Sequence, residues 1–213
     1  MAAECGLRVG RSLFYGADTL IVPRFDREVG AGSVVRLGQE SLVAATGIAE
    51  FGHITTHEQY IETLYRYCTD PKMEIVEYVL RDVLSVAMGD TDNHGRNTAL
   101  QKRPDGWIGL TPRFDFAPMV FDPGIIVPAT TWACLRGRPL NIGYGPVCAA
   151  IGEVTGESAI AAAVREALVD KAARIEMVPE IARRHEVPKE VISRACRRAF
   201  DIASMLRALA EET

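Results

Sequence analysis

The chain has no long apolar run, no basic-then-apolar leader and no closely spaced cysteine pair. No apolar stretch approaches the roughly 20 residues that a membrane-spanning helix needs. The first five residues, Met1 to Cys5, lack the layout of a signal peptide. The five cysteines are scattered without a C-x-x-C pair, which favours buried thiols over a disulfide frame or a zinc site. We therefore expect a cytoplasmic protein with no membrane association.

The chain also lacks internal repeats, low-complexity segments and a strong charge bias. A net charge of −4 over 213 residues gives no general attraction to nucleic acid or to anionic membranes, so we expect no direct nucleic-acid binding. Apolar residues make up 48% of the chain, which is enough to bury a substantial core. Hairpin and helix signals together predict an α+β fold that is mostly helical.

Helix signals are clearest in the middle of the chain. Asp70 and Pro71 suit an N-cap and the first helical position, and the residues that follow as far as Met88 are apolar nearly all round, which is typical of a buried helix. Thr56 and Gln59 form a capping box before another helix. Further helices are predicted over residues 39–46, 157–171 and 173–184, and from 188 past 206.

Strand signals come as hairpins. Residues 13–15 and 19–25 are predicted to pair over Gly16-Ala17-Asp18, and residues 98–101 and 107–110 over a Pro-Asp-Gly turn. Residues 26–35 predict a loop or irregular hairpin, and residues 118–146 a long irregular segment. A short helix at Met1 would have neither a cap nor a preceding turn, which leads us to expect further sequence upstream.

Two polar loops stand out between apolar segments. The first is Gly89-Asp90-Thr91-Asp92-Asn93-His94-Gly95-Arg96-Asn97, at the end of the predicted buried helix, and the second is Arg113-Phe114-Asp115-Phe116. They flank the same predicted hairpin, so its pairing can bring Asn97 and Asp115 to one end. A buried helix that ends in acidic residues holds them rigidly.

Several kinds of site could use these residues. A calcium loop fails because Gln101 stands where a bidentate glutamate is needed. A zinc site built on His53 and His57 lacks the glutamate of a zinc protease and a third ligand. A structural role, in which Asp and Asn side chains satisfy a turn and His94 bonds locally, fits each residue taken singly.

A kinase fits the residues taken together. Asp92 and Asn97 have the Asp-x-x-x-x-Asn spacing of a protein-kinase catalytic loop, and Asp115 with Phe116 and Ala117 stands where a D-F-G motif would. Such a loop turns Asp92 towards a hydroxyl while Asn97 faces a metal ion. Arg96 could neutralise charge that develops on the phosphoryl group.

In these loops and in two earlier segments, the sequence resembles HipA-like serine/threonine kinases, the toxins of bacterial toxin–antitoxin systems. The loop from Gly89 is similar to the family's N-x-D-x-H-x-K-N segment, and residues 110–115 resemble its L-S-P-A-Y-D segment. Arg24-Phe25-Asp26-Arg27 resembles the R-F-D-R signature that ends the hinge strand, and residues 36–40 resemble the R-L-H-Q-E that follows. The resemblance runs from near the start to at least Pro118 and implies a kinase-like C-lobe with small hairpins around the catalytic loop.

The resemblance also implies roles for individual residues. Asp92 would be the catalytic base, with His94 and Arg96 at the family's histidine and basic positions. Asn97 and Asp115 would be the magnesium ligands, and the backbone N–H of Phe25 would meet the adenine of ATP. Two departures are Asp90, which replaces an asparagine and adds negative charge beside the metal, and Pro23, which replaces a residue that is often acidic.

A third departure concerns the other half of such an enzyme. Family members carry an N-lobe with a phosphate-covering loop and a strand lysine that grips the nucleotide, whereas the first lysine here is Lys72. We expect residues 1–47 to be hinge strands and a remnant of the N-lobe junction, and residues 48–213 to be the helical lobe.

Two functions follow from the resemblance. One is the C-lobe of a HipA-like protein kinase that uses ATP and magnesium on a protein substrate, has a DNA-binding antitoxin as partner, and needs an N-lobe from a separate polypeptide or is a truncated copy. The alternative is a degenerate, non-catalytic lobe that binds an antitoxin or another protein.

Overall fold

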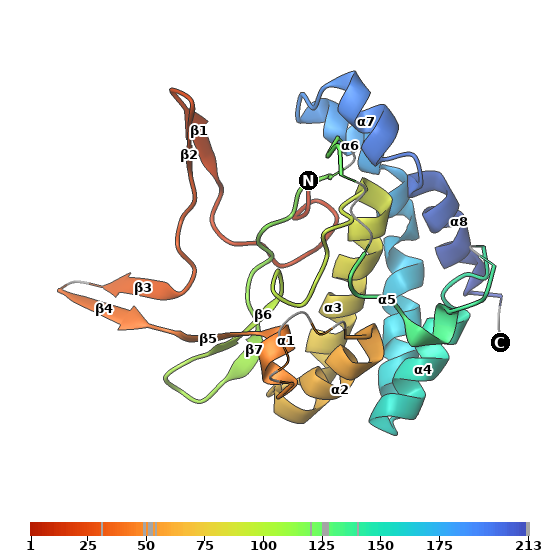
Figure 1. Cartoon of the computed structure of the whole chain (residues 1–213), viewed down its shortest axis with the longest axis horizontal. Helices are drawn as coiled ribbons and strands as arrows, with labels where there is room; N and C mark the ends of the chain where they lie inside the picture. Colours follow the sequence, from red (N-terminus) through yellow and green to blue (C-terminus); the bar gives the residue numbers. More distant parts are fainter. Residues whose placement is uncertain are drawn as a thin grey trace.

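A computed structural model describes the chain except for residues 31, 49, 51–52, 54, 120, 125–127, 140 and 212–213. Helices gather into one body, and two hairpins extend away from it on one side (Figure 1). The architecture is α+β and mostly helical, as the sequence predicts. Within the described residues, no helix is both long enough and apolar enough to cross a bilayer.

The strands form three small antiparallel sheets. Two are isolated hairpins, and the third has three strands in the order β5-β6-β7. Their bounds are β1 Phe14–Gly16, β2 Thr19–Ile21, β3 Arg27–Gly30, β4 Ser33–Arg36, β5 Gly38–Ser41, β6 Ala99–Lys102 and β7 Ile108–Leu110. The predicted hairpins over Gly16-Ala17-Asp18 and over the Pro-Asp-Gly turn are confirmed, with Ala17 and Asp18 in the left-handed region at φ 48° and 55°. Such angles fit a tight two-residue turn.

The helices pack around α5, and α3 lies between α5 and the strands (Figure 1). α5 packs against α3, α4 and α8, and α2 packs against α3 and α4. The bounds are α1 Leu42–Ala45, α2 His57–Tyr67, α3 Pro71–Met88, η1 Ala133–Leu135, α4 Gly145–Thr155, α5 Ser158–Glu176, α6 Val178–Arg184, α7 Lys189–Ala195 and α8 Ala199–Ala208. Thirteen of the 18 residues of α3 are buried, so the prediction of a buried helix is confirmed.

Both predicted helix starts have the expected caps. The Asp70 side chain accepts from the backbone N–H of Met73 at 3.0 Å, and α3 ends at Gly89 in the left-handed region. Thr56 and Gln59 form both bonds of the capping box. These local signals therefore set the ends of the helices that position the polar loops.

Other boundaries differ from prediction. Residues 38–41 form strand β5 instead of the start of a helix, because they pair with β6. The predicted break near residue 172 is wrong, since α5 continues to Glu176, and the predicted last helix is split into α7 and α8. α4 has no counterpart among the predicted helices, and part of the irregular segment 118–146 lies outside the described residues.

The N-terminal segment joins the helical body. Residues 1–6 form a turn, and Cys5 and Leu7 lie in the same apolar core as α3 and α5. Val9 forms a parallel bridge with Arg113. The division of the chain at residues 47 and 48 stays a prediction.

Candidate active site

The first polar loop begins where the buried helix ends. Gly89 has a φ of 66°, which favours glycine, and the N–H of Asp90 donates to the carbonyl of Ser85 at 2.9 Å. At the far end of the loop, the Thr98 carbonyl accepts from the N–H of Leu42 at 2.8 Å, and Ala99 starts β6. The loop is therefore fixed at both ends by regular structure.

Within this loop, the backbone carbonyl of Asp92 accepts two hydrogen bonds. The carbonyl oxygen of Asp92 accepts from the His94 N–H at 2.9 Å and from Nδ2 of Asn97 at 3.1 Å. Asn97 is buried. Because its amide nitrogen is bound to the loop, its Oδ1 is the side-chain atom left to face a cation. The bond also holds the predicted base and the predicted metal ligand in one rigid turn.

His94 lies against the Asp92 side chain. Its Nε2 is 3.5 Å from Oδ1 of Asp92, and its Nδ1 accepts from the Arg96 N–H at 3.3 Å. A ring nitrogen that accepts a hydrogen bond carries no proton, so this geometry assigns the proton to Nε2, beside the carboxylate. Asp92 and His94 are partly exposed and Arg96 is exposed, so all three can meet a substrate.

Asp115 lies in the second polar loop. It is exposed, and its φ of 49° is unusual for a residue other than glycine. Residues in such conformations are held by their surroundings and concentrate at functional sites. Here the preceding segment is fixed by a hydrogen bond from the Arg113 N–H to the Arg8 carbonyl at 3.0 Å.

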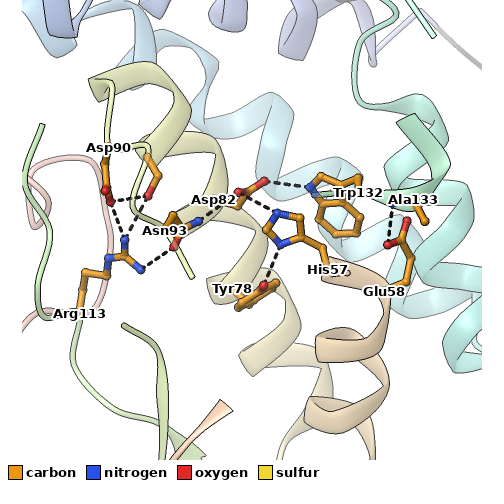
Figure 2. A network of polar contacts seen from close by, with 10 residues as sticks. His57, Glu58, Tyr78, Asp82, Asp90, Asn93, Arg113, Trp132 and Ala133 are labelled. Atoms are coloured by element: carbon orange, nitrogen blue, oxygen red, sulfur yellow. Dashed lines mark hydrogen bonds and ion pairs between the residues drawn. The ribbon is translucent and has the colours of Figure 1, made fainter. Parts of the chain in front are cut away.

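A buried ion pair joins the two loops. Nη2 of Arg113 is 2.9 Å from Oδ2 of Asp90, and each side chain is only 2% exposed (Figure 2). Ser85 contacts both groups through its Oγ at 3.1 Å. Burial raises the pKa of Asp90, and the Arg113 guanidinium opposes that rise. The negative charge that Asp90 was expected to add beside a metal is thus compensated within the protein.

The ion pair continues into a wider polar network (Figure 2). Nη1 of Arg113 donates to Oδ1 of Asn93 at 3.2 Å, and Nδ2 of Asn93 donates to Oδ1 of Asp82 at 3.2 Å. Asp82 also accepts from Nε1 of Trp132 at 2.9 Å. This chain of bonds links the first loop to α3 and to the segment before η1.

His57 closes the network on the side of α2. Its Nε2 is 3.4 Å from Oδ1 of Asp82, its Nδ1 is 2.8 Å from the Tyr78 hydroxyl, and its ring stacks on Trp132 at 4.7 Å. His57 therefore has a structural setting. Within the described part of the chain, no group of three His, Cys, Asp or Glu side chains could hold a metal ion.

Sequence reasoning missed Asp82 and Trp132. The available signal was the presence of charged residues, Asp82 among them, within a predicted buried helix, because a buried carboxylate needs partners. Its partners lie far away in the sequence and could not be read from local patterns. The network holds the first loop through Asn93, which bonds to Asp82 of α3 and to Arg113. None of the predicted catalytic residues belongs to it.

Phe25 lies between β2 and β3. Its carbonyl accepts from Nε2 of Gln101 at 2.9 Å, and its ring contacts Phe114 with centroids 5.6 Å apart. Phe114 precedes Asp115, so the segment between β2 and β3 contacts the second loop. Phe25 also lines a groove of about 800 Å³ whose other lining residues include Arg11, Arg24 and Arg27. This volume is within the range of small-molecule sites.

The magnesium ligands expected from the sequence fit the donor chemistry of that ion. Magnesium takes one or two carboxylates together with substrate phosphates and water, and it does not need a complete protein cage. Asn97 offers a fixed amide oxygen and Asp115 an exposed carboxylate. The two residues are therefore compatible with a metal ion that arrives with a nucleotide.

Comparison with known proteins gives a family and a fold. Residues 1–198 match the family described as the HipA-like C-terminal domain. A chain of the solved Shewanella oneidensis MR-1 toxin antitoxin system HipA, HipB and operator DNA complex is similar in structure, with a TM-score of 0.67 and 17% sequence identity. The match covers 99% of the present chain and 53% of that one, so the present chain spans about half its length. A comparison with curated proteins finds no match.

Proposed function

The chain belongs to the HipA-like C-terminal domain family, and from that membership we propose that it is the C-lobe of a serine/threonine protein kinase. The proposed reaction transfers the γ-phosphoryl group of ATP to a hydroxyl of a protein substrate. The observation that carries the proposal is the 3.1 Å bond from Asn97 to the Asp92 carbonyl, which holds a candidate base and a candidate metal ligand in one turn.

In this proposal each candidate site residue has one role. Asp92 accepts the hydroxyl proton at its carboxylate, and His94 orients that carboxylate through Nε2. Asn97 and Asp115 hold magnesium, which when bound supplies positive charge at the nucleotide phosphates. Arg96 supplies a further cation beside the reacting group. Phe25 offers its N–H to the adenine.

A second polypeptide region would complete the nucleotide site. Catalysis of phosphoryl transfer depends mostly on positioning and charge, and no lysine precedes Lys72 to grip the phosphates. The first hairpin supports docking of an N-lobe because its apolar side chains are each more than half exposed. They are Leu13, Phe14, Tyr15, Leu20, Ile21 and Val22. Such a surface is typical of a protein contact.

The proposed partner is a DNA-binding antitoxin. The similar solved structure is described as HipA with HipB and its operator DNA, and we extend that type of assembly to this family member. The alternative function is a non-catalytic lobe that only binds such a partner. The presence of Asp92, Asn97 and Asp115 together favours the kinase over this alternative.

Nucleotide binding distinguishes these functions. We expect ATP with magnesium to raise the thermal unfolding midpoint of the wild-type chain, and Asp115→Ala and Asn97→Ala to reduce that shift. Glu153→Ala, which removes an exposed carboxylate on α4, is the control and should keep the full shift. No shift for the wild type, or an equal shift for Asp115→Ala, would reject the nucleotide site.

A further inference from the structure

One arginine contacts the first loop on both sides of Asp92. Nη2 of Arg113 pairs with Asp90 at 2.9 Å, two residues before Asp92, and Nη1 donates to Asn93 at 3.2 Å, one residue after it (Figure 2). A guanidinium has a planar, rigid set of donors that can hold two acceptors in a fixed relation. Arg113 therefore holds the stretch of backbone that carries the candidate base.

The backbone of the same arginine is itself fixed. Its N–H donates to the Arg8 carbonyl at 3.0 Å, and it forms a parallel bridge with Val9. Its guanidinium also lies over the Phe116 ring, 5.0 Å from the centroid. Asp115 follows Arg113 by two residues, so the side chain of Arg113 grips one loop while its backbone belongs to the other.

The ion pair depends on both of its members. Either charge alone would be buried without compensation, which is strongly unfavourable. The two side chains meet at 2.9 Å, and each is 2% exposed. The pair is therefore a direct tie between the two loops.

We infer that Arg113 is a positioning residue that sets the relation between Asp92 and Asp115. The inference rests on the proposed function, which gives Asp92 the role of base and Asp115 that of metal ligand. The Asp90–Arg113 ion pair itself is present without any ligand. In this inference, the Asp90–Arg113 pair keeps the two loops in a fixed position relative to each other. Removing the pair as a whole should therefore loosen both loops even when no charge is left unpaired.

Hydrogen exchange followed by mass spectrometry tests the tie in the ligand-free chain. In Asp90→Asn/Arg113→Ala we expect a midpoint of unfolding closer to wild type than either single variant gives, because no charge is buried alone. Amides of residues 90–98 and 111–116 should nevertheless exchange at least about tenfold faster than in the wild type. Arg24→Ala, which breaks an exposed arginine–aspartate pair, is the control and should leave both segments unchanged.

If both segments of the double variant exchange at the wild-type rate, the inference is wrong. The ion pair would then only neutralise two buried charges without restraining the loops. Should the double variant not fold, Arg113→Lys decides instead, because lysine keeps a cation but cannot hold Asp90 and Asn93 in the same planar arrangement. Faster loop exchange in Arg113→Lys supports the tie, and unchanged exchange rejects it.

Manganese binding, measured by electron paramagnetic resonance in the presence of ATP, separates this inference from the proposed function. The double variant should bind Mn²⁺ more weakly than the wild type if both are right. Absence of binding in the wild type would count against the kinase function alone, since hydrogen exchange is read without metal or nucleotide.

Discussion

Nη2 of Arg8 lies 2.9 Å from Oε2 of Glu74, a side chain with no exposed surface in the first turn of α3. The same arginine donates through Nη1 to the Leu110 carbonyl at 3.0 Å, and its N–H donates to Oε1 of Glu77 at 3.0 Å. The N-terminal segment thus fixes the start of α3 to the end of β7.

We expect Arg8→Ala to lower the free energy of unfolding by about 2–4 kcal/mol, because the buried Glu74 carboxylate would lose its cation. Urea unfolding followed by circular dichroism measures the change. The control is Arg24→Ala, whose pair with Asp26 is exposed and should contribute much less to stability. If the two variants lower the free energy of unfolding equally, the buried Arg8–Glu74 pair stabilises the protein no more than an exposed pair does.

Gly95 has no room for a side chain. A Cβ added to it would overlap the hydroxyl of Tyr60, whose ring is rigid and 2% exposed. We expect Gly95→Ala to destabilise the protein by roughly 1–3 kcal/mol and to displace the loop that contains Asp92 and Asn97. Thermal unfolding and the nucleotide-induced shift measure the two effects.

Gly152 is the matched control for that substitution. It lies inside α4, and an added Cβ would meet the Cβ of Ala161 at 3.4 Å, an ordinary contact. Gly152→Ala should therefore be neutral or stabilising by up to about 1 kcal/mol, because alanine favours helix. A Gly95→Ala variant as stable as Gly152→Ala would contradict the close packing of the loop on Tyr60.

Cys134 should react slowly although it is partly exposed. Burial, together with the neighbouring Glu58 carboxylate, raises the pKa of its thiol from 9.0 to about 12. Since the thiolate is the nucleophile, alkylation of Cys134 by iodoacetamide at pH 8–9 should be much slower in the folded protein than in urea. Glu58→Gln should lower that pKa and speed the reaction. Half-maximal reactivity of folded Cys134 near pH 9 would contradict this assignment.

Asp26 should remain ionised to low pH. Arg24 donates to its carboxylate through Nε at 2.7 Å and Nη2 at 2.6 Å, and these bonds lower the pKa of Asp26 from 3.8 to about 2. The folded pKa lies below the unfolded one, so the stabilising contribution is complete above pH 3.8 and is lost as the pH falls through about 2.

A carboxyl-carbon NMR titration measures this value directly. Arg24→Ala should return the pKa of Asp26 towards 3.8, and Arg36→Ala, which removes an exposed arginine of the following β3–β4 hairpin, should leave it near 2. A wild-type pKa close to 3.8 would show that the Arg24–Asp26 pair does not persist in solution.

The amino-acid sequence by itself determined the elements whose signals are local. Asp70, Pro71 and Gly89 set both ends of α3, because capping and backbone preferences act within one or two turns. The Thr56–Gln59 capping box set the start of α2 for the same reason. The spacing of Asp92 and Asn97 also places the candidate base and one candidate metal ligand in a single loop.

Only the tertiary structure decided the relations between distant residues. β5 exists because its residues pair with β6 some 60 positions away, which outweighs the helical pattern at residues 39–41, whereas residues 42–45 form α1. The compensation of Asp90 by Arg113 and the burial of Asp82 against Trp132 likewise depend on how loops and helices pack. Buried polar groups need partners, but local sequence does not say which residues the fold will bring to them.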